Sequence, residues 1–296
     1  MFKNLAIVTL ISLPIFASQI DVYNHFASAN RLIIEGRMLH KKEFTIVSKE
    51  DGVFQNLWRR LKQLTSDEIK NKKIIMTVAQ DRYESIGDDE GYFEFDVQLK
   101  KPLLTGHEDI QLCIKDNTAC AHVKVPVLGG KAIGIISDFD DTVVISNVTN
   151  KFKLLLNLLF KNYKQRRVVP TMAKRFKEIL SKNPETLPST LFFVTGSPQQ
   201  LYGSIKQFLT HHDFPNSVII TKKIHGADID PLLEQFAYKT EQIETLFELY
   251  PQMQWVMFGD SGEKDRAVYQ HLKEKYPQKV KRYYIRDVDD GEIKSY

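Results

Sequence analysis

The stretch KAIGIISDFDDTVVISNVT, residues 131–149, decides how the rest of the chain is interpreted. The run Ile133–Ser137 predicts a short buried strand, and three aspartates and a threonine follow at once in DFDDT, Asp138–Thr142. Strand ends carry active sites in open α/β sheets, and carboxylates gathered at such a point repel one another unless a cation is bound. The stretch therefore predicts a metal-dependent phosphoryl-transfer site.

Length and composition set the frame for this prediction. The chain has 296 residues, which predicts roughly two domains, and its content of 43% hydrophobic and 26% charged residues is that of a soluble globular protein. The formal net charge of +4 is too small to indicate nucleic-acid binding, which requires a concentrated basic surface. We expect no nucleic-acid partner and no stable protein partner.

The first residues have the pattern of a signal peptide. Lys3 supplies a positive charge, Leu5–Phe16 is an apolar segment of suitable length, and Ala17 is a small residue suited to the position before a cleavage site. Because the segment is short for a membrane span and Pro14 interrupts it, cleavage is favoured over anchoring. We expect residues 1–18 to direct export to the periplasm or the cell exterior, with peripheral membrane attachment left open; a buried helix is the alternative.

The two cysteines, Cys113 and Cys120, agree with export. They lie in the stretch LCIKDNTAC, where a two-residue turn at Asp116 and Asn117 would place them directly opposite each other across a hairpin. A disulfide is geometrically feasible, and two small buried thiols are the alternative. The sequence leaves both open.

Residues 19–130 alternate like strands separated by turn clusters, which predicts a small β-sandwich-like domain. The segment Phe54–Leu64 has apolar residues at helical spacing and predicts one helix in this half. Gly129 and Gly130 mark the expected domain boundary. The predicted strands are Arg31–Leu39, Lys73–Gln80, Gly91–Leu99, Ile110–Lys115 and Ala121–Val127.

Residues 131–296 change to an alternation of apolar strands and helices, which predicts an α/β fold with a Rossmann-like, doubly wound parallel sheet. In such a sheet the carboxyl ends of the strands face one crevice, and Asp138, Thr195 and Asp260 all fall at predicted strand ends. The predicted strands are Ile133–Ser137, Leu191–Thr195, Val218–Thr221, Trp255–Gly259 and Arg282–Ile285, and the predicted helices are 171–182, 199–211, 239–250 and 265–276.

Four motifs in this half resemble those of the haloacid-dehalogenase superfamily of phosphatases, in the same order. DFDDT resembles the first motif, D-x-D-x-T, and FFVTGSP at Phe192–Pro198 resembles the second. Lys239, expected at a helix start, resembles the third, and GDSGEKD at Gly259–Asp265 resembles the acidic fourth. The stretches SNVT, SPQQLY and GDSGEKD further resemble the actin-patch type of phosphatidate phosphatase and its bacterial relatives. That family pairs a β-sandwich-like N-terminal region with this catalytic domain.

The resemblance implies catalytic roles for individual residues. Asp138 is the nucleophile that forms an aspartyl-phosphate, and Asp140 protonates the leaving alcohol and then activates water. Thr195 donates a hydrogen bond to a phosphoryl oxygen, with Ser197 as the alternative, and Lys239 stabilises the charge that develops there. The implied phosphate-binding residues are Asp138, Thr195, Gly196, Ser197 and Lys239.

The resemblance also implies Mg²⁺, because the ligands would be carboxylates and a backbone carbonyl. Asp138 and Asp260 would bind the ion through their side chains and Asp140 through its carbonyl oxygen. Thr142 would hold the loop or orient Asp140. Asp265 would steady the metal site or the lysine of the third motif.

Residues 151–182 form the most basic part of the chain, with ten Lys and Arg against one acid. The segment begins with apolar residues at helical spacing, and a basic, apolar helix beside an active site suits a lipid phosphate at an interface. A core or capping helix with a solvated basic rim is the alternative, and a soluble phosphate ester would be attracted there as well. The expected contacts with membrane or substrate are Lys161, Lys164, Arg166 and Arg167.

These observations predict an exported, magnesium-dependent phosphatase that converts phosphatidate or a related lipid phosphate to diacylglycerol. One alternative is an exported phosphomonoesterase of broad specificity from the same superfamily. Another is a phosphatidate-binding module without activity, although such a module would be expected to lose Asp138, Asp140 or Asp260, and all three are present.

Overall fold

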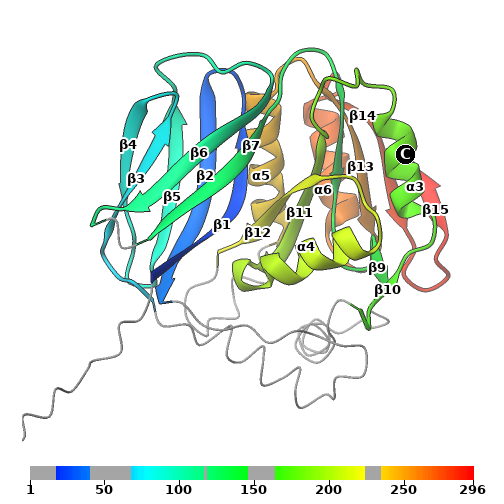
Figure 1. Ribbon diagram of the computed structural model, residues 1–296. Coiled ribbons are helices and arrows are strands. Elements are labelled where there is room, and N and C mark those ends of the chain that lie inside the picture. Colours follow the sequence, from blue (N-terminus) through cyan, green and yellow to red (C-terminus); the bar gives the residue numbers. More distant parts are fainter. Residues whose placement is uncertain (1–17, 41–67, 117–118, 146–163, 224–234) are drawn as a thin grey trace, which may run out of the picture.

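The computed structural model describes residues 18–40, 68–116, 119–145, 164–223 and 235–296 (Figure 1). The predicted helix Phe54–Leu64, Lys161 and the predicted signal peptide lie outside the described residues, apart from Ser18, which begins the first strand. Within the described residues no helix is long and apolar enough to cross a membrane.

The N-terminal half forms one strongly curved, near-barrel sheet of seven strands in the order β4-β3-β6-β7-β1-β2-β5 (Figure 1). All paired neighbours are antiparallel except β1 and β7. The strands are β1 (Ser18–Ala27), β2 (Arg31–His40), β3 (Lys73–Val78), β4 (Asp81–Ile86), β5 (Tyr92–Gln98), β6 (Gly106–Ile114) and β7 (Cys120–Val127).

The prediction of a β-sandwich was therefore wrong in one respect, because these strands form a single sheet and not two packed ones. Alternation of apolar residues indicates which side chains face the core, but a curved sheet and a sandwich give the same alternation. Curvature lets Ile34, Ile74 and Leu112, from three strands, share one enclosed core. Strands β1 and β4 were not predicted; β1 contains a register shift between Val22 and His25, and β4 is mostly polar.

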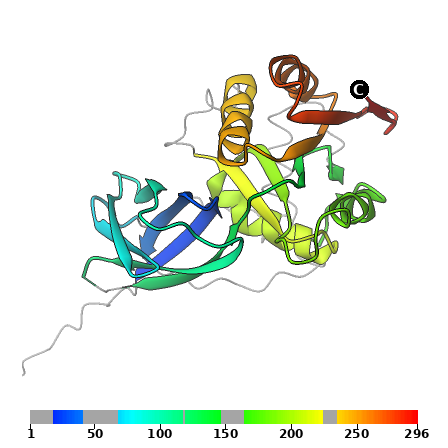
Figure 2. The ribbon, with the colours of Figure 1, turned by 90° about the horizontal axis from the view of Figure 1, so that it is seen from above.

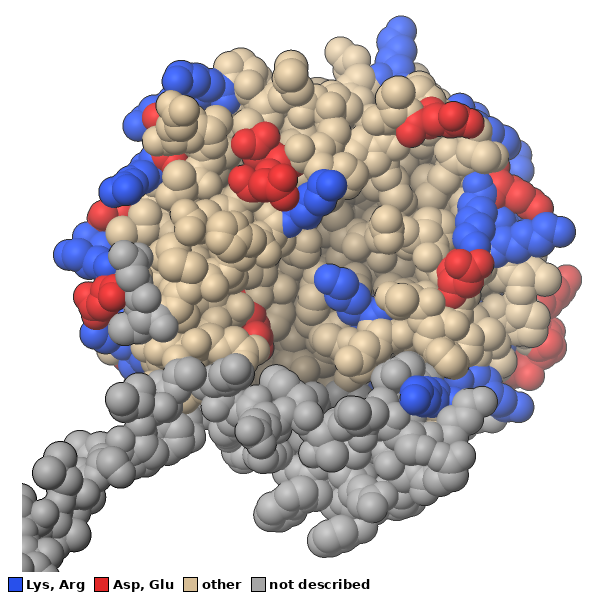
Figure 3. Space-filling view, viewed as in Figure 1, with Lys and Arg blue, Asp and Glu red and all other residues tan. Residues whose placement is uncertain are grey.

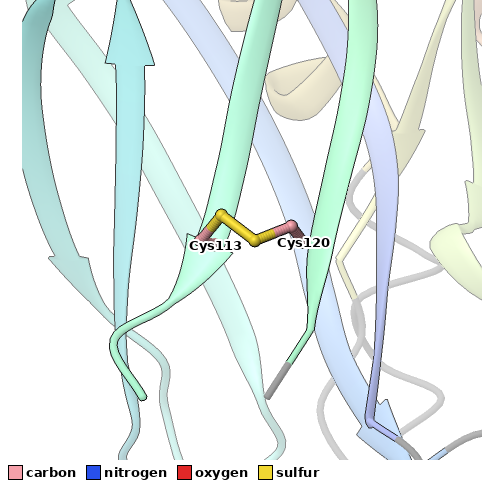
Figure 4. Close-up of a disulfide and its surroundings, with 2 residues drawn as sticks. All are labelled: Cys113 and Cys120. Carbon is pink, nitrogen blue, oxygen red and sulfur yellow. A yellow bond between two sulfur atoms is a disulfide. The ribbon is translucent and has the colours of Figure 1, made fainter. Parts of the chain in front are cut away.

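The two cysteines form a disulfide between β6 and β7, with an S–S distance of 2.01 Å (Figure 4). They occupy directly opposite positions of the two strands, which is the register expected from a short turn between them. Of the two arrangements that the sequence left open, the structure thus contains the disulfide and not the pair of thiols.

The C-terminal half is built on a mainly parallel sheet of six strands in the order β12-β11-β8-β13-β14-β15, in which only β15 is antiparallel. The five predicted strands are all present. The strands are β8 (Ile133–Ser137), β11 (Leu191–Pro198), β12 (Ser217–Lys222), β13 (Gln254–Asp260), β14 (Val280–Arg286) and β15 (Ile293–Ser295), with a separate small pair formed by β9 (Val144–Ile145) and β10 (Arg167–Val168).

Helices cover both faces of this sheet (Figure 2). Helices α3 (Met172–Leu180) and α4 (Tyr202–His211) pack on one face, and α5 (Gln235–Leu249) and α6 (Asp265–Lys275) pack on the other. From the central strand β8 the chain first builds β11 and β12 on one side and then crosses to β13 and β14 on the other. In open α/β sheets, ligands bind at the carboxyl ends of the strands on either side of such a reversal of direction.

The two halves are packed against each other through side chains of β1 and β2. Phe26 and Ile33 belong to the same apolar core as the α5 and α6 face of the second sheet, and Phe26 packs edge-on against Phe192 with ring centroids 5.8 Å apart. Two buried polar contacts add to this: the Tyr250 hydroxyl donates to the carbonyl of Ala27 at 3.1 Å, and the N–H of Thr221 donates to Oδ1 of Asn24 at 3.1 Å.

Candidate active site

The predicted site residues come from separate elements that end at the same edge of the second sheet. Asp138 directly follows β8, and its N–H donates to the carbonyl of Phe258, so it continues the β8–β13 pairing. Asp260 is the last residue of β13, and Thr195 and Ser197 lie in β11. Ile133–Ser137 forms a strand because it is a short apolar run that is buried on both faces, and the chain becomes polar where that burial ends.

Lys239 is the centre of a buried ionic cluster. Its Nζ donates to Asp138 Oδ1 at 2.9 Å, to Glu263 Oε2 at 3.1 Å and to Asp265 Oδ1 at 2.5 Å. The side chains of Lys239 and Asp138 are each only 1% exposed. Burial lowers the pKa of Lys239, but the neighbouring carboxylates, Asp138 first, outweigh it and raise the pKa well above its ordinary value. This lysine is therefore a permanent cation next to Asp138.

The position of Lys239 differs from the prediction in one respect. It lies in the second turn of the described helix α5, which includes Gln235, and not at the helix start. A lysine one turn inside the helix reaches the site with its full side chain, which explains how it can be almost completely buried. Gln235 itself donates from Nε2 to Glu263 Oε1 at 3.2 Å and packs over Gly196.

The motif GDSGEKD folds into a tight loop that aims its acids inward. Asp260 Oδ1 accepts the N–H groups of Gly262 and Glu263 at 2.6 and 3.0 Å, and Asp265 Oδ2 accepts the N–H of Asp260 at 3.2 Å. Gly259 is required for this packing, because a Cβ atom there would lie 2.5 Å from Asp265 Oδ2. Asp260 and Asp265 are fully buried.

Three carboxylates of the site lie close enough together to hold a metal ion. Asp138, Glu263 and Asp265 each offer an oxygen atom within 4.8 Å of the others. Asp138 Oδ2 and Asp260 Oδ2 are buried and have no hydrogen-bond partner among the described residues. Burial, together with repulsion between these acids, raises the pKa of Asp138, Asp265 and Asp260, that of Asp260 to about 8. A cation would relieve this repulsion and satisfy the unpartnered oxygens, so the residues present fit one.

The three acids that lie close enough together to hold an ion overlap the predicted metal ligands only at Asp138. Asp265 was predicted in a supporting role, and Glu263 was not predicted at all. The sequence did contain a signal, since Glu263 lies inside GDSGEKD, but only the two hydrogen bonds from the loop to Asp260 turn it toward Lys239.

Asp140 lies beside this cluster and interacts with other partners. The Ser197 hydroxyl donates to Asp140 Oδ2 at 3.0 Å, and the N–H of Ser197 donates to Thr195 Oγ1 at 3.1 Å. Burial raises the pKa of Asp140 to about 6 against the opposing positive charge of Arg166. This value suits a group that gives and takes a proton near neutral pH. Thr142 is buried next to it, with 1% of its surface exposed.

The basic residues predicted to contact membrane or substrate are found in different environments. Arg166 is buried, with 9% exposed, and its charge acts on Asp140, so it does not contribute to an open basic surface. Arg167 is exposed in β10, and Lys164 is partly buried.

Comparison with known proteins identifies the second half of the chain. The family model for the catalytic domain of phosphatidate phosphatase APP1 matches residues 133–287. Phosphatidate phosphatase APP1 of Saccharomyces cerevisiae is 26% identical over 155 residues, which is 52% of this chain and 26% of the yeast protein. An uncharacterised protein of Schizosaccharomyces pombe, C29B5.04c, is 26% identical over 209 residues, which is 67% of this chain and 33% of that protein.

This chain thus spans a third or less of the length of these two curated relatives. Among solved structures, a carbohydrate acetylesterase from Xanthomonas citri aligns with a TM-score of 0.30 and 11% identity over 90% of this chain and 66% of its own, a similarity too weak to carry an argument. The family match covers just over half of the 296 residues and includes DFDDT, the Thr195 loop, Lys239 and GDSGEKD. The chain therefore belongs to the family of the phosphatidate phosphatase APP1 catalytic domain.

Proposed function

We propose that this protein is a magnesium-dependent phosphatase that hydrolyses phosphatidate, or a related lipid phosphate, to diacylglycerol and inorganic phosphate. The observation that carries the proposal is the environment of Asp138. One of its oxygens binds Lys239, and the other is buried without a partner among the described residues, in a family described by phosphatidate phosphatase activity. The bond to Lys239 fixes the orientation of this carboxylate and leaves its second oxygen available to a substrate or cation.

In the first step Asp138 attacks the phosphorus atom, and the bond between phosphorus and the lipid alcohol oxygen breaks. The product is an aspartyl-phosphate, an acyl phosphate on the Asp138 carboxylate, which divides one difficult hydrolysis into two easier transfers. Lys239 lies against the nucleophile and stabilises the charge on the transferring phosphoryl group. The hydroxyl of Thr195 accepts from the N–H of Ser197 and keeps its own hydrogen for a phosphoryl oxygen.

Asp140 moves the proton in both steps. With a pKa of about 6, it carries a proton in part of the population near neutral pH and gives it to the departing alcohol oxygen. As a carboxylate it then takes a proton from the water that attacks the Asp138 phosphate, which releases phosphate and restores Asp138. The Ser197 hydroxyl holds Asp140 in place for both transfers. Thr142 is buried beside the same loop and supports it.

The acids of the site would hold Mg²⁺, which favours hard oxygen ligands. Asp138 Oδ2 and Asp260 Oδ2, which have no partner among the described residues, would be available for this together with the carbonyl of Asp140. The group of Asp138, Glu263 and Asp265 already binds Lys239 Nζ and would hold the ion only in its place. When bound, the ion supplies positive charge that offsets repulsion between the Asp138 carboxylate and a dianionic phosphate.

The lipid character of the substrate rests on the family and on the basic segment of residues 151–182. The face seen in Figure 3 carries Lys and Arg mixed with Asp and Glu, around its edge and nearer its centre, so its described residues form no continuous basic surface for an anionic membrane. We therefore assign contact with lipid to the basic segment, and with the N-terminal pattern we propose an exported protein that acts at a membrane surface.

One experiment tests the reaction and the substrate class together. Purified protein with Mg²⁺ is given phosphatidate in mixed micelles and, in parallel, a soluble phosphomonoester; Asp138→Asn and a chelator serve as controls. We expect faster turnover of phosphatidate, lost in both controls. Turnover of the soluble ester alone would point to a phosphomonoesterase of broad specificity, and binding of phosphatidate without turnover would point to a binding module.

A further inference from the structure

The residues Thr195–Ser197 lie where β11 leaves the regular pairing of the sheet. Strand β11 pairs with β8 only as far as Phe193 and with β12 as far as Val194, and its register shifts before pairing with β12 resumes at Pro198. Among them, Ser197 donates its hydroxyl to Asp140, and all three are proposed to contact phosphate. Since the neighbouring strands do not fix them by ladder pairing, their position depends on other contacts.

The N-terminal sheet supplies such contacts immediately after this loop. Gln199, which is 1% exposed, donates from Nε2 to Glu35 Oε2 of β2 at 2.7 Å. The next residue, Gln200, donates from Nε2 to the hydroxyl of Tyr92 in β5 at 2.7 Å. The end of the loop is thus attached to two strands of the other half of the molecule.

Glu35 is itself held firmly. Asn24 donates from Nδ2 to the same Glu35 oxygen at 2.9 Å, and the Oδ1 atom of Asn24 accepts the N–H of Thr221 in β12. Both amides donate to the same oxygen of Glu35, so its carboxyl group is held from two sides. Glu35 of β2 therefore bonds Asn24 of β1 and Gln199, which follows β11 two residues after Ser197, and Asn24 extends the connection to β12.

We propose that the N-terminal sheet positions the catalytic loop through the hydrogen bond between Glu35 and Gln199, so that both are positioning residues for phosphoryl transfer. The proposal rests on the proposed function for its kinetic consequence. Only Pro198 separates Gln199 from Ser197, so a shift of Gln199 carries the Ser197 hydroxyl away from Asp140. Misplacement of a reacting group by about 1 Å can cost roughly 100-fold in rate.

The test compares variants of the full chain in two measurements: kcat and KM for phosphatidate in mixed micelles, and amide hydrogen exchange of residues 195–201. All variants are assayed at pH 8, above the pKa of Glu35. Glu35→Ala removes the acceptor, and Gln199→Glu replaces the amide donor by a carboxylate that repels Glu35. The double variant Glu35→Gln/Gln199→Glu restores a bond between an amide and a carboxylate in the opposite orientation. Tyr250→Phe is the matched control, because it removes a different buried hydrogen bond between the two halves, far along the chain from the loop.

We expect both single variants to lower kcat by roughly 10- to 100-fold with little change in KM, and to speed exchange in the loop. The double variant should regain most of the lost kcat, and Tyr250→Phe should keep the wild-type kcat and loop exchange. An unchanged kcat and exchange in Glu35→Ala, an equal loss in Tyr250→Phe, or no recovery in the double variant would overturn the proposal. If the wild type turns over neither phosphatidate nor a soluble ester, the proposed function fails, and the exchange data alone then decide whether Glu35 positions the loop.

Discussion

Gly259→Ala tests the tight packing of the fourth motif with the smallest possible change. The added Cβ would lie 2.5 Å from both Cβ and Oδ2 of Asp265 and 2.8 Å from its Cγ, where ordinary contacts exceed 3.4 Å. Asp265 cannot turn aside freely, because its two oxygens bind Lys239 and the N–H of Asp260. Either the strand or this carboxylate must move.

The magnitude follows from these contacts. Overpacking of a rigid interior costs about 1–3 kcal/mol, and weakening the charged hydrogen bond between Asp265 and Lys239 adds about 1.5–3 kcal/mol. We therefore expect Gly259→Ala to lose roughly 3–5 kcal/mol of unfolding free energy. A displacement of Lys239 by about 1 Å would lower kcat by roughly 100-fold.

Urea unfolding and phosphatase turnover at a temperature where the variant is folded measure the two effects. Gly203→Ala is the matched control, because Gly203 lies in helix α4 and a Cβ there meets no atom within 4 Å. Alanine is the better helix former, so this control should gain up to about 1 kcal/mol and keep its activity. If Gly259→Ala had the stability and kcat of the wild type, the packing of Asp265 against this strand would not be what holds Lys239, and the reasoning would be refuted.

Three further changes have defined outcomes. Asp138→Asn should lower kcat by at least about 1,000-fold while leaving binding of phosphatidate micelles intact, since an amide cannot form the acyl-phosphate; turnover near the wild-type rate would exclude Asp138 as the nucleophile. Burial, then the charge of Glu94, raises the pKa of Glu35 from 4.5 to about 7. Between these two pH values the folded protein keeps a proton on Glu35 that the unfolded protein releases. The stability that this proton gives the folded state is therefore complete below about pH 4.5 and is lost as the pH rises to 7. The melting temperature of Glu35→Gln should therefore improve relative to the wild type from pH 5 to pH 8, and parallel curves would contradict this pKa. Replacing Cys113 and Cys120 by serine opens a loop of about eight residues and should lower the free energy of unfolding in urea by about 2.5 kcal/mol. The variant should keep the wild-type kcat, because the disulfide lies outside the site. Equal stability of the oxidised wild type and the double variant would show that the bridge does not constrain the unfolded chain.

The parallel sheet could be predicted from the sequence because its strands are short apolar runs, such as Ile133–Ser137, each followed by polar residues at the sheet edge. The order of the four motifs was enough to bring Asp138, Lys239 and the fourth motif together, although they lie far apart in the chain. The orientation of Glu263 was not predictable, since it depends on the backbone hydrogen bonds that the loop gives to Asp260.

The arrangement of the N-terminal half was harder to predict from the sequence, because it too depends on contacts between distant parts of the chain. Apolar alternation in β2 or β6 does not reveal how the sheet curves, and β4 is too polar to stand out. The bond between Glu35 and Gln199 joins residues 164 positions apart, and neither lies in a pattern that differs from an ordinary exposed strand or helix start. Contacts of this kind depend on how the two halves pack, which no local signal records.

The shared core described above has a consequence for how the chain folds as it is made. Phe26 and Ile33 belong to a core most of whose other members come from the second sheet and its helices, and Tyr23 and Tyr92 pack in the same way against the opposite face. The N-terminal sheet is synthesised first, and it can close around Ile34, Ile74 and Leu112 while these four side chains stay uncovered. Among the described residues, Phe26 and Ile33 are covered by side chains of β11, β12 and α5, and Tyr23 packs against Tyr202 of α4. The nascent first half therefore exposes an apolar surface that only the second half of the same chain can cover, which couples completion of synthesis to completion of folding.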